Sequence, residues 1–201
     1  MIKLIDKQGS LKQIISKEPA SKKCSNFTTH YLAFKKRNLL VRKQSLFYKC
    51  FLGLFLSVGV WLLIFITFYD PVYRRGAPPF GGEDIWGDLL AYFLSVTFSM
   101  AGFAGLFCEP KLIIDHALKL IYCVSRDGTQ RELCDFDEIH SLQILKKRCS
   151  DGEDDYYAYE LNIVTLNLKR FNILVHGGEQ AIRRDAKLLS KFLKIDIVDH
   201  A

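Results

Sequence analysis

Two long uncharged runs interrupt an otherwise polar chain. The first covers residues 50–69, between Lys49 and Asp70, and the second covers residues 89–108. Each run is about 30 Å long as an α-helix, which matches the hydrocarbon core of a bilayer. A soluble protein can bury apolar helices instead, but two uncharged runs of this length are hard to cover in a chain of 201 residues. The pattern therefore predicts a transmembrane helical hairpin.

The composition of the two runs limits their role. The first run is not a cleavable signal peptide, because it starts nearly fifty residues into the chain and no small-residue cleavage site follows it. Neither run contains Asp, Glu, Lys, Arg or His, which argues against a proton relay or an ion path. Ser95 and Ser99, and likewise Ala101 and Gly105, have the small-x-x-x-small spacing that allows helices to approach closely. We expect these residues to pack the two spans on each other, with a homo-oligomer as the alternative.

After residue 109 the pattern changes to short segments in which apolar and polar residues alternate. These segments predict about six antiparallel strands, at residues 111–115, 118–124, 131–136, 139–145, 156–166 and 170–175. Residues 179–193 then place Ile182, Ala186, Leu189 and Leu193 on one face of a helix. The predicted fold class is a membrane helical hairpin followed by an α+β domain, a small antiparallel sheet or open barrel closed by a C-terminal helix.

The rest of the chain is polar. Residues 1–29 are rich in Lys and predict a loosely ordered segment, with a short amphipathic helix over residues 2–15 as an alternative. Residues 70–88 are rich in Pro and Gly and predict an irregular loop. The predicted organisation is a basic N-terminal segment at 1–49, a hairpin at 50–108 and a domain at 109–201.

Charge is distributed unevenly along the chain, and this predicts its orientation. Residues 1–49 contain 12 Lys or Arg and 2 Asp or Glu, whereas residues 70–88 contain only two Arg against four acidic residues. Basic residues next to a span favour the cytoplasmic side of a membrane. We therefore expect a multi-pass protein of the cytoplasmic (inner) membrane, with both termini in the cytoplasm and the loop facing outward.

Part of this positive charge lies immediately before the first span. Next to a membrane, basic residues attract anionic lipid headgroups by about 1 kcal/mol each. Lipid is thus an expected partner of this segment, although the charges can also serve only to fix the orientation. Nucleic acid is not an expected partner, because the segment lies against the bilayer. The candidate anionic-lipid contacts are Lys35, Lys36, Arg37, Arg42, Lys43 and Lys49.

The cysteines predict reduced thiols. None of the six lies in the loop at 70–88, and no Cys-x-x-Cys pair is present. This pattern indicates neither a disulfide framework nor a structural zinc site. The six are Cys24, Cys50, Cys108, Cys123, Cys134 and Cys149.

The region after the second span resembles a known group of domains. The stretch PKLIIDHALKLIYCVSRDGTQRELCDFDEIHSLQIL is similar to the opening strands of bacterial pleckstrin-homology-like (PH-like) domains, and YELNIVTLNLKRFNILVHGGEQAIRRDAKLLSKFLKIDIVD is similar to their last strands and helix. The two spans followed by such a domain resemble uncharacterised bacterial membrane proteins. The resemblance implies a PH-like fold and transfers no catalytic residue. The phosphoinositide-binding basic cluster of the first hairpin is not evident, since that hairpin carries only Lys111, Lys119 and Arg126.

No catalytic residue, cofactor site or metal site is expected. His116, His140 and His176 are not at metal-ligand spacing, and we expect structural or surface roles for them. Gly177 and Gly178 lack the remaining residues of a phosphate-binding loop and predict a turn before a helix. Nothing in the sequence places a base and an orienting group around Cys123 or Cys134. The acidic residues at 151–155 lack the alternation of a calcium loop and read as a solvated loop.

These observations favour a non-enzymatic interaction or scaffold protein that is anchored in the membrane and binds a protein partner. Two alternatives remain open at the level of sequence. One is a membrane immunity protein that neutralises a toxin, a role that suits small two-span proteins. The other is a sensor of anionic lipid that uses the basic residues before the first span.

Overall fold

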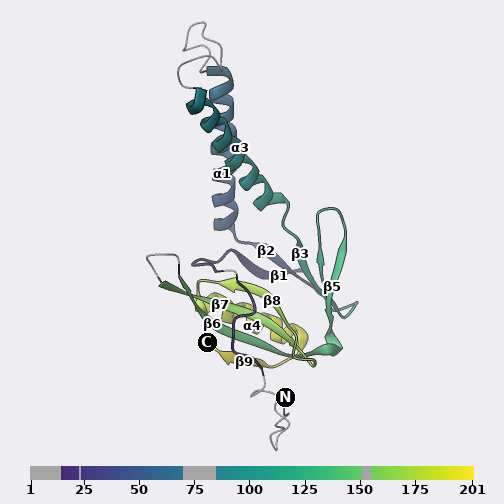
Figure 1. The fold of residues 1–201 in the computed structure, drawn as a ribbon. Helices are drawn as coiled ribbons and strands as arrows, with labels where there is room; N and C mark the ends of the chain where they lie inside the picture. The colour runs from purple at the N-terminus through teal and green to yellow at the C-terminus, as the bar shows by residue number, and fades with distance from the viewer. Residues whose placement is uncertain (1–14, 23, 70–84, 151–154) are drawn as a thin grey trace, which may run out of the picture. The chain divides into compact units, whose positions relative to one another are not determined.

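The chain forms two compact units in the computed structural model, which describes residues 15–22, 24–69, 85–150 and 155–201. One unit is the continuous segment 46–110. The other combines the residues before that segment with residues 111–201. Figure 1 shows the first unit as a pair of helices and the second as strands with one helix.

The unit at 46–110 contains two long apolar helices. Helix α1 covers Leu46–Ile64 and continues as the π-helical turn η2 at Phe65–Tyr69, and helix α3 covers Ile85–Phe107. Both are long and apolar enough to cross a membrane. Each begins about four residues earlier than the uncharged run predicts, so Lys49 and Asp88 lie in the first turns of their helices. Most of the predicted loop, residues 70–84, lies outside the described residues.

Small residues bring α1 and α3 together, as their spacing predicts. A Cβ atom on Gly59 would lie 2.5 Å from the backbone nitrogen of Ser99, and one on Gly102 would lie 2.5 Å from that of Leu56. Ser95 is fully buried beside Gly59. Ala101, however, is exposed, and its neighbour Gly102 makes the close contact instead.

The second unit contains two sheets. The first is antiparallel, in the order β1-β2-β3-β4-β5. It consists of β1 (His30–Lys36), β2 (Leu39–Gln44), β3 (Lys111–Asp115), β4 (Leu120–Val124) and β5 (Gln130–Asp135).

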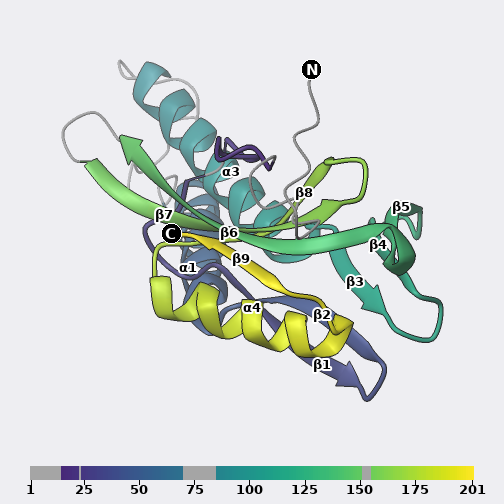
Figure 2. The same ribbon diagram turned by 90° about the horizontal axis from the view of Figure 1, so that it is seen from below.

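The 3-10 turn η3, at Phe136–Glu138, leads into the second sheet, which has the order β8-β7-β6-β9. In this sheet β6, β7 and β8 are antiparallel neighbours, and β9 runs parallel to β6. Figure 2 shows helix α4, at Glu179–Leu193, lying along this unit. The strands are β6 (Ile139–Ser150), β7 (Asp155–Thr165), β8 (Arg170–His176) and β9 (Ile197–His200).

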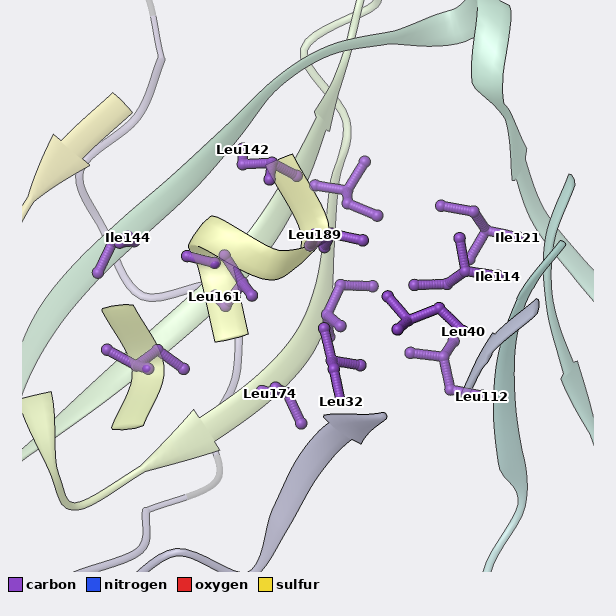
Figure 3. Close-up of a cluster of buried hydrophobic side chains, with 14 of the residues drawn as sticks. Leu32, Leu40, Leu112, Ile114, Ile121, Leu142, Ile144, Leu161, Leu174 and Leu189 are labelled. Carbon is purple, nitrogen blue, oxygen red and sulfur yellow. The ribbon is translucent and has the colours of Figure 1, made fainter. Parts of the chain in front are cut away.

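Leucine and isoleucine side chains from both sheets and from α4 form one core (Figure 3). The predicted stripe of α4 supplies Ile182, Ala186 and Leu189, all fully buried. Burial of each large aliphatic side chain contributes about 1.5–3 kcal/mol. The core therefore joins the two sheets into one unit. Its first sheet contributes Leu32, Leu40, Leu112, Ile114 and Ile121, and its second contributes Leu142, Ile144, Leu161, Ile163, Ile173 and Leu174.

All six strands expected after residue 109 are present, but the sheets contain three further strands. Strands β1 and β2 lie in the segment 1–49, and β9 follows the helix. The structure therefore groups the residues differently from the predicted boundary between a basic segment and a separate domain at 109–201. The reason is that Leu32 and Leu40, on β1 and β2, are needed to complete the core.

The helical hairpin is inserted between two neighbouring strands. Strand β2 pairs with β3, with Leu40 opposite Ile114 and Val41 opposite Ile113. The chain leaves the sheet from β2 into α1 and returns from α3 into β3. The two strands that connect to the hairpin are therefore neighbours in one sheet, and their pairing extends to Val41 and Ile113.

We predict that Gly59→Ala loosens the contact between α1 and α3. The new methyl group meets backbone atoms of Ser99 and Ser95, which cannot rotate away, so we expect a loss of about 1–3 kcal/mol of stability. Thermal unfolding of the detergent-solubilised protein measures this loss. Gly53→Ala is the matched control, because a Cβ there meets nothing within 4 Å. Equal losses in the two variants would contradict the packing.

Candidate functional site

The second sheet has one apolar face and one polar face. Along β7, Leu161 and Ile163 point into the core, while Glu160 and Asn162, which alternate with them, point to the opposite face. Glu160 and Asn162 are nevertheless fully buried. Something other than the core must therefore cover the polar face.

The cover is an irregular segment before β1, which we call the strap and define as residues 15–22 and 24–29. Figure 1 shows it in purple running past the second sheet. Its main chain bonds to side chains of β6, β7 and β8 in turn, through Gln143, Glu160 and Arg170. Residues 1–29 were expected to be loosely ordered, whereas residues 15–29, apart from 23, adopt a defined path; the alternative amphipathic helix lies almost entirely outside the described residues.

A buried ion pair lies at the centre of this contact. Lys147 Nζ is 2.8 Å from Glu160 Oε1, and the two side chains are 4% and 0% exposed. The strap completes both charged groups: Lys147 donates to the Ser21 carbonyl, and the Glu160 carboxylate accepts the amide protons of Ala20 and Ser21. Buried charges are tolerated only when they are paired and hydrogen-bonded. The strap is therefore part of what makes this ion pair stable.

Amide side chains extend the polar network on both sides of the ion pair. Asn162 donates to Glu160, and Asn172 donates to Asn162 at 2.9 Å. Gln143 and Arg170 each donate to the Ser16 carbonyl at 3.0 Å. Every one of these contacts to the strap uses its main chain.

Further contacts hold the strap in place. Ile15 packs on Val164 and Val198 in a small separate cluster. Cys24 forms a disulfide with Cys149 of β6.

Near β1, the Gly177 amide donates to the Phe27 carbonyl at 3.4 Å. Gly177 is required there because a Cβ atom would overlap the backbone of Asn26. The turn predicted at Gly177 and Gly178 is thus also the point where the strap meets β8.

The disulfide corrects the prediction that all cysteines are reduced. Cys24 and Cys149 are 125 residues apart and have no spacing that marks a pair. Only the path of the strap across β6 brings them to a Cα–Cα distance of 6.1 Å. Spacing along the sequence therefore carried no signal for this bond.

The remaining cysteines of the two-sheet unit are unactivated thiols. Burial, together with the nearby carboxylates of Glu138 and Asp135, raises the pKa of Cys134 to about 12. Burial also raises the pKa of Cys123, although Arg42 and Arg131 oppose this shift. Since the thiolate is the nucleophile, both side chains are unreactive at neutral pH.

His116, His140 and His176 each contact different residues. His176 is buried, and its Nε2 is 3.2 Å from Asp185 Oδ2, which also accepts the Leu32 amide proton at 3.3 Å. His116 contacts the rings of Phe136 and Phe192. His140 hydrogen-bonds Ser141 at 3.1 Å. The residues that the structure describes include no group of three His, Cys, Asp or Glu that could hold a metal ion.

The six basic residues proposed for lipid lie on several elements of the chain. Lys35 and Lys36 end β1, and Arg37 lies in the turn before β2. Lys49 lies in the first turn of α1. The other two lie on β2, where Lys43 is exposed and Arg42 donates to the Ile173 carbonyl at 3.5 Å.

The polar sheet face was not predicted from the sequence. Its signal is the pair Glu160 and Asn162, which alternate with apolar residues in a strand that is otherwise buried on both faces. Such residues normally indicate a solvated face, and the strap makes this face an exception.

We predict that Lys147→Met destabilises the protein by about 3–5 kcal/mol, because the Glu160 carboxylate is left buried without its partner. Denaturant unfolding of the full-length protein measures the loss. Lys146→Met is the matched control: Lys146 is exposed on the opposite face, and its contact with the Tyr157 ring contributes about 1 kcal/mol or less. Similar losses for the two variants would mean that Lys147 is not buried in an ion pair.

Gly177→Ala should displace the strap where it meets β8, because the new methyl group has no space beside Asn26. We expect a loss of about 1–3 kcal/mol in the free energy of unfolding. In Gly178→Ala the methyl group meets only Ala181, at 3.9 Å, so the loss is limited to about 1 kcal/mol from the altered helix cap. A Gly177→Ala variant as stable as Gly178→Ala would exclude the close contact.

Comparisons with protein-family models, with curated proteins and with solved structures return no match for this chain. A functional assignment therefore depends on the burial, charge and contacts of its own residues.

Proposed function

We propose that this protein is a membrane-anchored, non-enzymatic interaction protein. In this proposal α1 and α3 form the anchor, and the two-sheet unit binds a protein partner. The observation that carries it is the insertion of an apolar helical hairpin between paired strands of a folded unit.

The surface of the hairpin supports a membrane location. Large apolar side chains cover both helices; Leu46 and Trp86, for example, are 77% and 79% exposed. Soluble proteins rarely expose apolar surface of this extent, whereas a bilayer is its natural solvent. The close packing at Gly59 and Gly102 supports a hairpin that enters the membrane as one unit.

The orientation with the two-sheet unit in the cytoplasm is part of the proposal. It is supported by Lys43 and Lys49, which lie next to the start of α1, and by the excess of basic residues over residues 1–49. Lys36 lies at the turn end of the β1–β2 hairpin and Lys43 near its other end, and this separation gives less support to a lipid sensor.

A PH-like fold is also proposed for the two-sheet unit. Its support is the order of elements: an antiparallel set β3-β4-β5, a second set β6-β7-β8 and then α4. In this proposal β1, β2 and β9 are additions to that arrangement. The extra strands from before the hairpin place both connections to the anchor in one sheet.

The polar sheet face supports a role in binding. It already bonds main-chain groups of the irregular strap through Glu160, Lys147 and Gln143. The thiol of Cys134 and the side chains of His176 and Asp185 are buried in the interior. These placements favour binding over catalysis.

We predict that the full-length protein stays in the membrane fraction after an alkaline carbonate wash. A protease-sensitive tag after Ala201 should be cleaved only in inside-out vesicles, and one inserted between residues 75 and 80 only in right-side-out vesicles. Release by the wash would overturn the anchor, and reversed tag cleavage would overturn the orientation.

A second experiment tests the interaction itself. The protein is cross-linked in its native membrane, extracted in mild detergent and analysed for partners. We expect a stoichiometric protein partner that is lost when the two-sheet unit is replaced by an unrelated soluble domain on the same hairpin. Recovery of the same proteins by the hairpin alone would contradict a binding role for the two-sheet unit.

A further inference from the structure

The strap contacts the polar sheet face in a way that depends little on its own sequence. The face bonds the carbonyl groups of Ser16, Glu18 and Ser21 and the amide groups of Ala20 and Ser21. Residues 16–20 keep their side chains exposed. Main-chain hydrogen bonds of this kind supply affinity without selecting the side chains of the bound segment.

Part of this face is ordered by contacts that do not involve the strap. Lys147 and Glu160 hold each other at 2.8 Å, and the chain Asn172–Asn162–Glu160 fixes the carboxylate. Without the strap these groups lose the partners that Ala20 and Ser21 provide. Water or the main chain of another peptide must then replace them, and another peptide can reproduce the same bonds.

One covalent bond holds the strap to this face. Cys24 is exposed, whereas Cys149 on β6 is 3% exposed. Main-chain hydrogen bonds and the side chain of Ile15 also attach the strap. Loss of the disulfide removes the covalent attachment of a segment without regular secondary structure, and such segments typically open locally.

We propose that the polar sheet face is a docking surface that binds the main chain of a peptide segment of a partner protein, that the strap occupies it within the chain, and that reduction of the Cys24–Cys149 disulfide opens it. This inference rests on the proposed function, because it names the site and the control of the same interaction.

The reduction is an ordinary thiol–disulfide exchange with a dithiol reductant. A thiolate of the reductant attacks Cys24 Sγ, the accessible sulfur, and Cys149 leaves as a thiolate that takes up a proton. The second thiol of the reductant then attacks the mixed disulfide and releases Cys24 as a thiol. The reductant is oxidised to its disulfide, and the protein gains two electrons and two protons.

In the proposed orientation, this bond responds to the redox state of the cytoplasm. In the cytoplasm thiols are kept reduced, and disulfides that form there are transient and respond to redox state. On that side of the membrane the strap is closed only under oxidising conditions. The docking surface is thus open in the resting cytoplasm and closed by oxidation.

Hydrogen exchange of two amides tests the opening of the strap. Ala20 and Ser21 donate to Glu160, so their protection reports directly on the docked strap. In the full-length protein in detergent, we expect reduction or Cys24→Ser to speed their exchange by about tenfold or more, with Cys123→Ser as the matched control that leaves it unchanged. Equal protection in all forms, or absence of a Cys24–Cys149 bond from the oxidised protein, overturns the proposal.

Disulfide trapping tests the docking surface. The probe is a synthetic peptide of residues 15–25 whose Cys24 is activated as a mixed disulfide with an aromatic thiol. In the Cys24→Ser protein the Cys149 thiolate attacks the peptide sulfur and expels the aromatic thiolate. We expect attachment at Cys149 about tenfold faster than for a peptide of scrambled order with the cysteine kept in place.

Two variants identify the groups responsible. Glu160→Gln should lower trapping to the rate of the scrambled peptide, whereas Glu132→Gln, on the exposed part of β5, should not change it. Equal rates for the two peptides overturn the docking surface while leaving the anchor and its partner intact. A reoxidised wild-type protein whose Cys24–Cys149 bonds join mainly two copies would make a second copy the occupant, and would overturn a partner protein in that place.

Discussion

The pairing of β2 with β3 is the contact on which the rest of the structure depends. Leu40 and Ile114 lie opposite each other in this pair, although the whole helical hairpin separates them along the chain. Both are fully buried in the core. Without this pairing the first sheet would divide into two parts, and the connections to α1 and α3 would no longer start from neighbouring strands.

A second dependence links the strap to the sheet. The Lys147–Glu160 pair places two charges in the interior, where each costs several kcal/mol unless its hydrogen bonds are complete. The strap supplies those bonds through its main chain, and the pair in turn gives an irregular segment a fixed position. Interior charges of this kind are costly when one of their partners is removed.

The sequence predicted the elements whose signal is local. Twenty uncharged residues marked each apolar helix, alternation marked six strands, and the spacing of Ile182, Ala186 and Leu189 marked α4. It did not reveal β1 and β2, because basic residues beside an apolar run are explained equally well by membrane orientation.

The candidate site was not predicted, since its parts meet only in the folded chain. Glu160 and Lys147 lie on neighbouring strands, and the strap that covers them comes from far earlier in the sequence. The Cys24–Cys149 bond has the same character. Contacts through the main chain of the strap also produce no sequence motif, because almost any side chain is compatible with them.

The interrupted sheet also sets an order of events during synthesis. Strand β3 leaves the ribosome about 70 residues after β2, a delay of roughly 3–14 s at ordinary elongation rates. During that interval Leu32 and Leu40 have no core to enter. The β1–β2 hairpin therefore remains a partly folded intermediate with unburied leucines until both helices and β3 have been synthesised, so synthesis of α1 and α3 is complete before the first sheet can form.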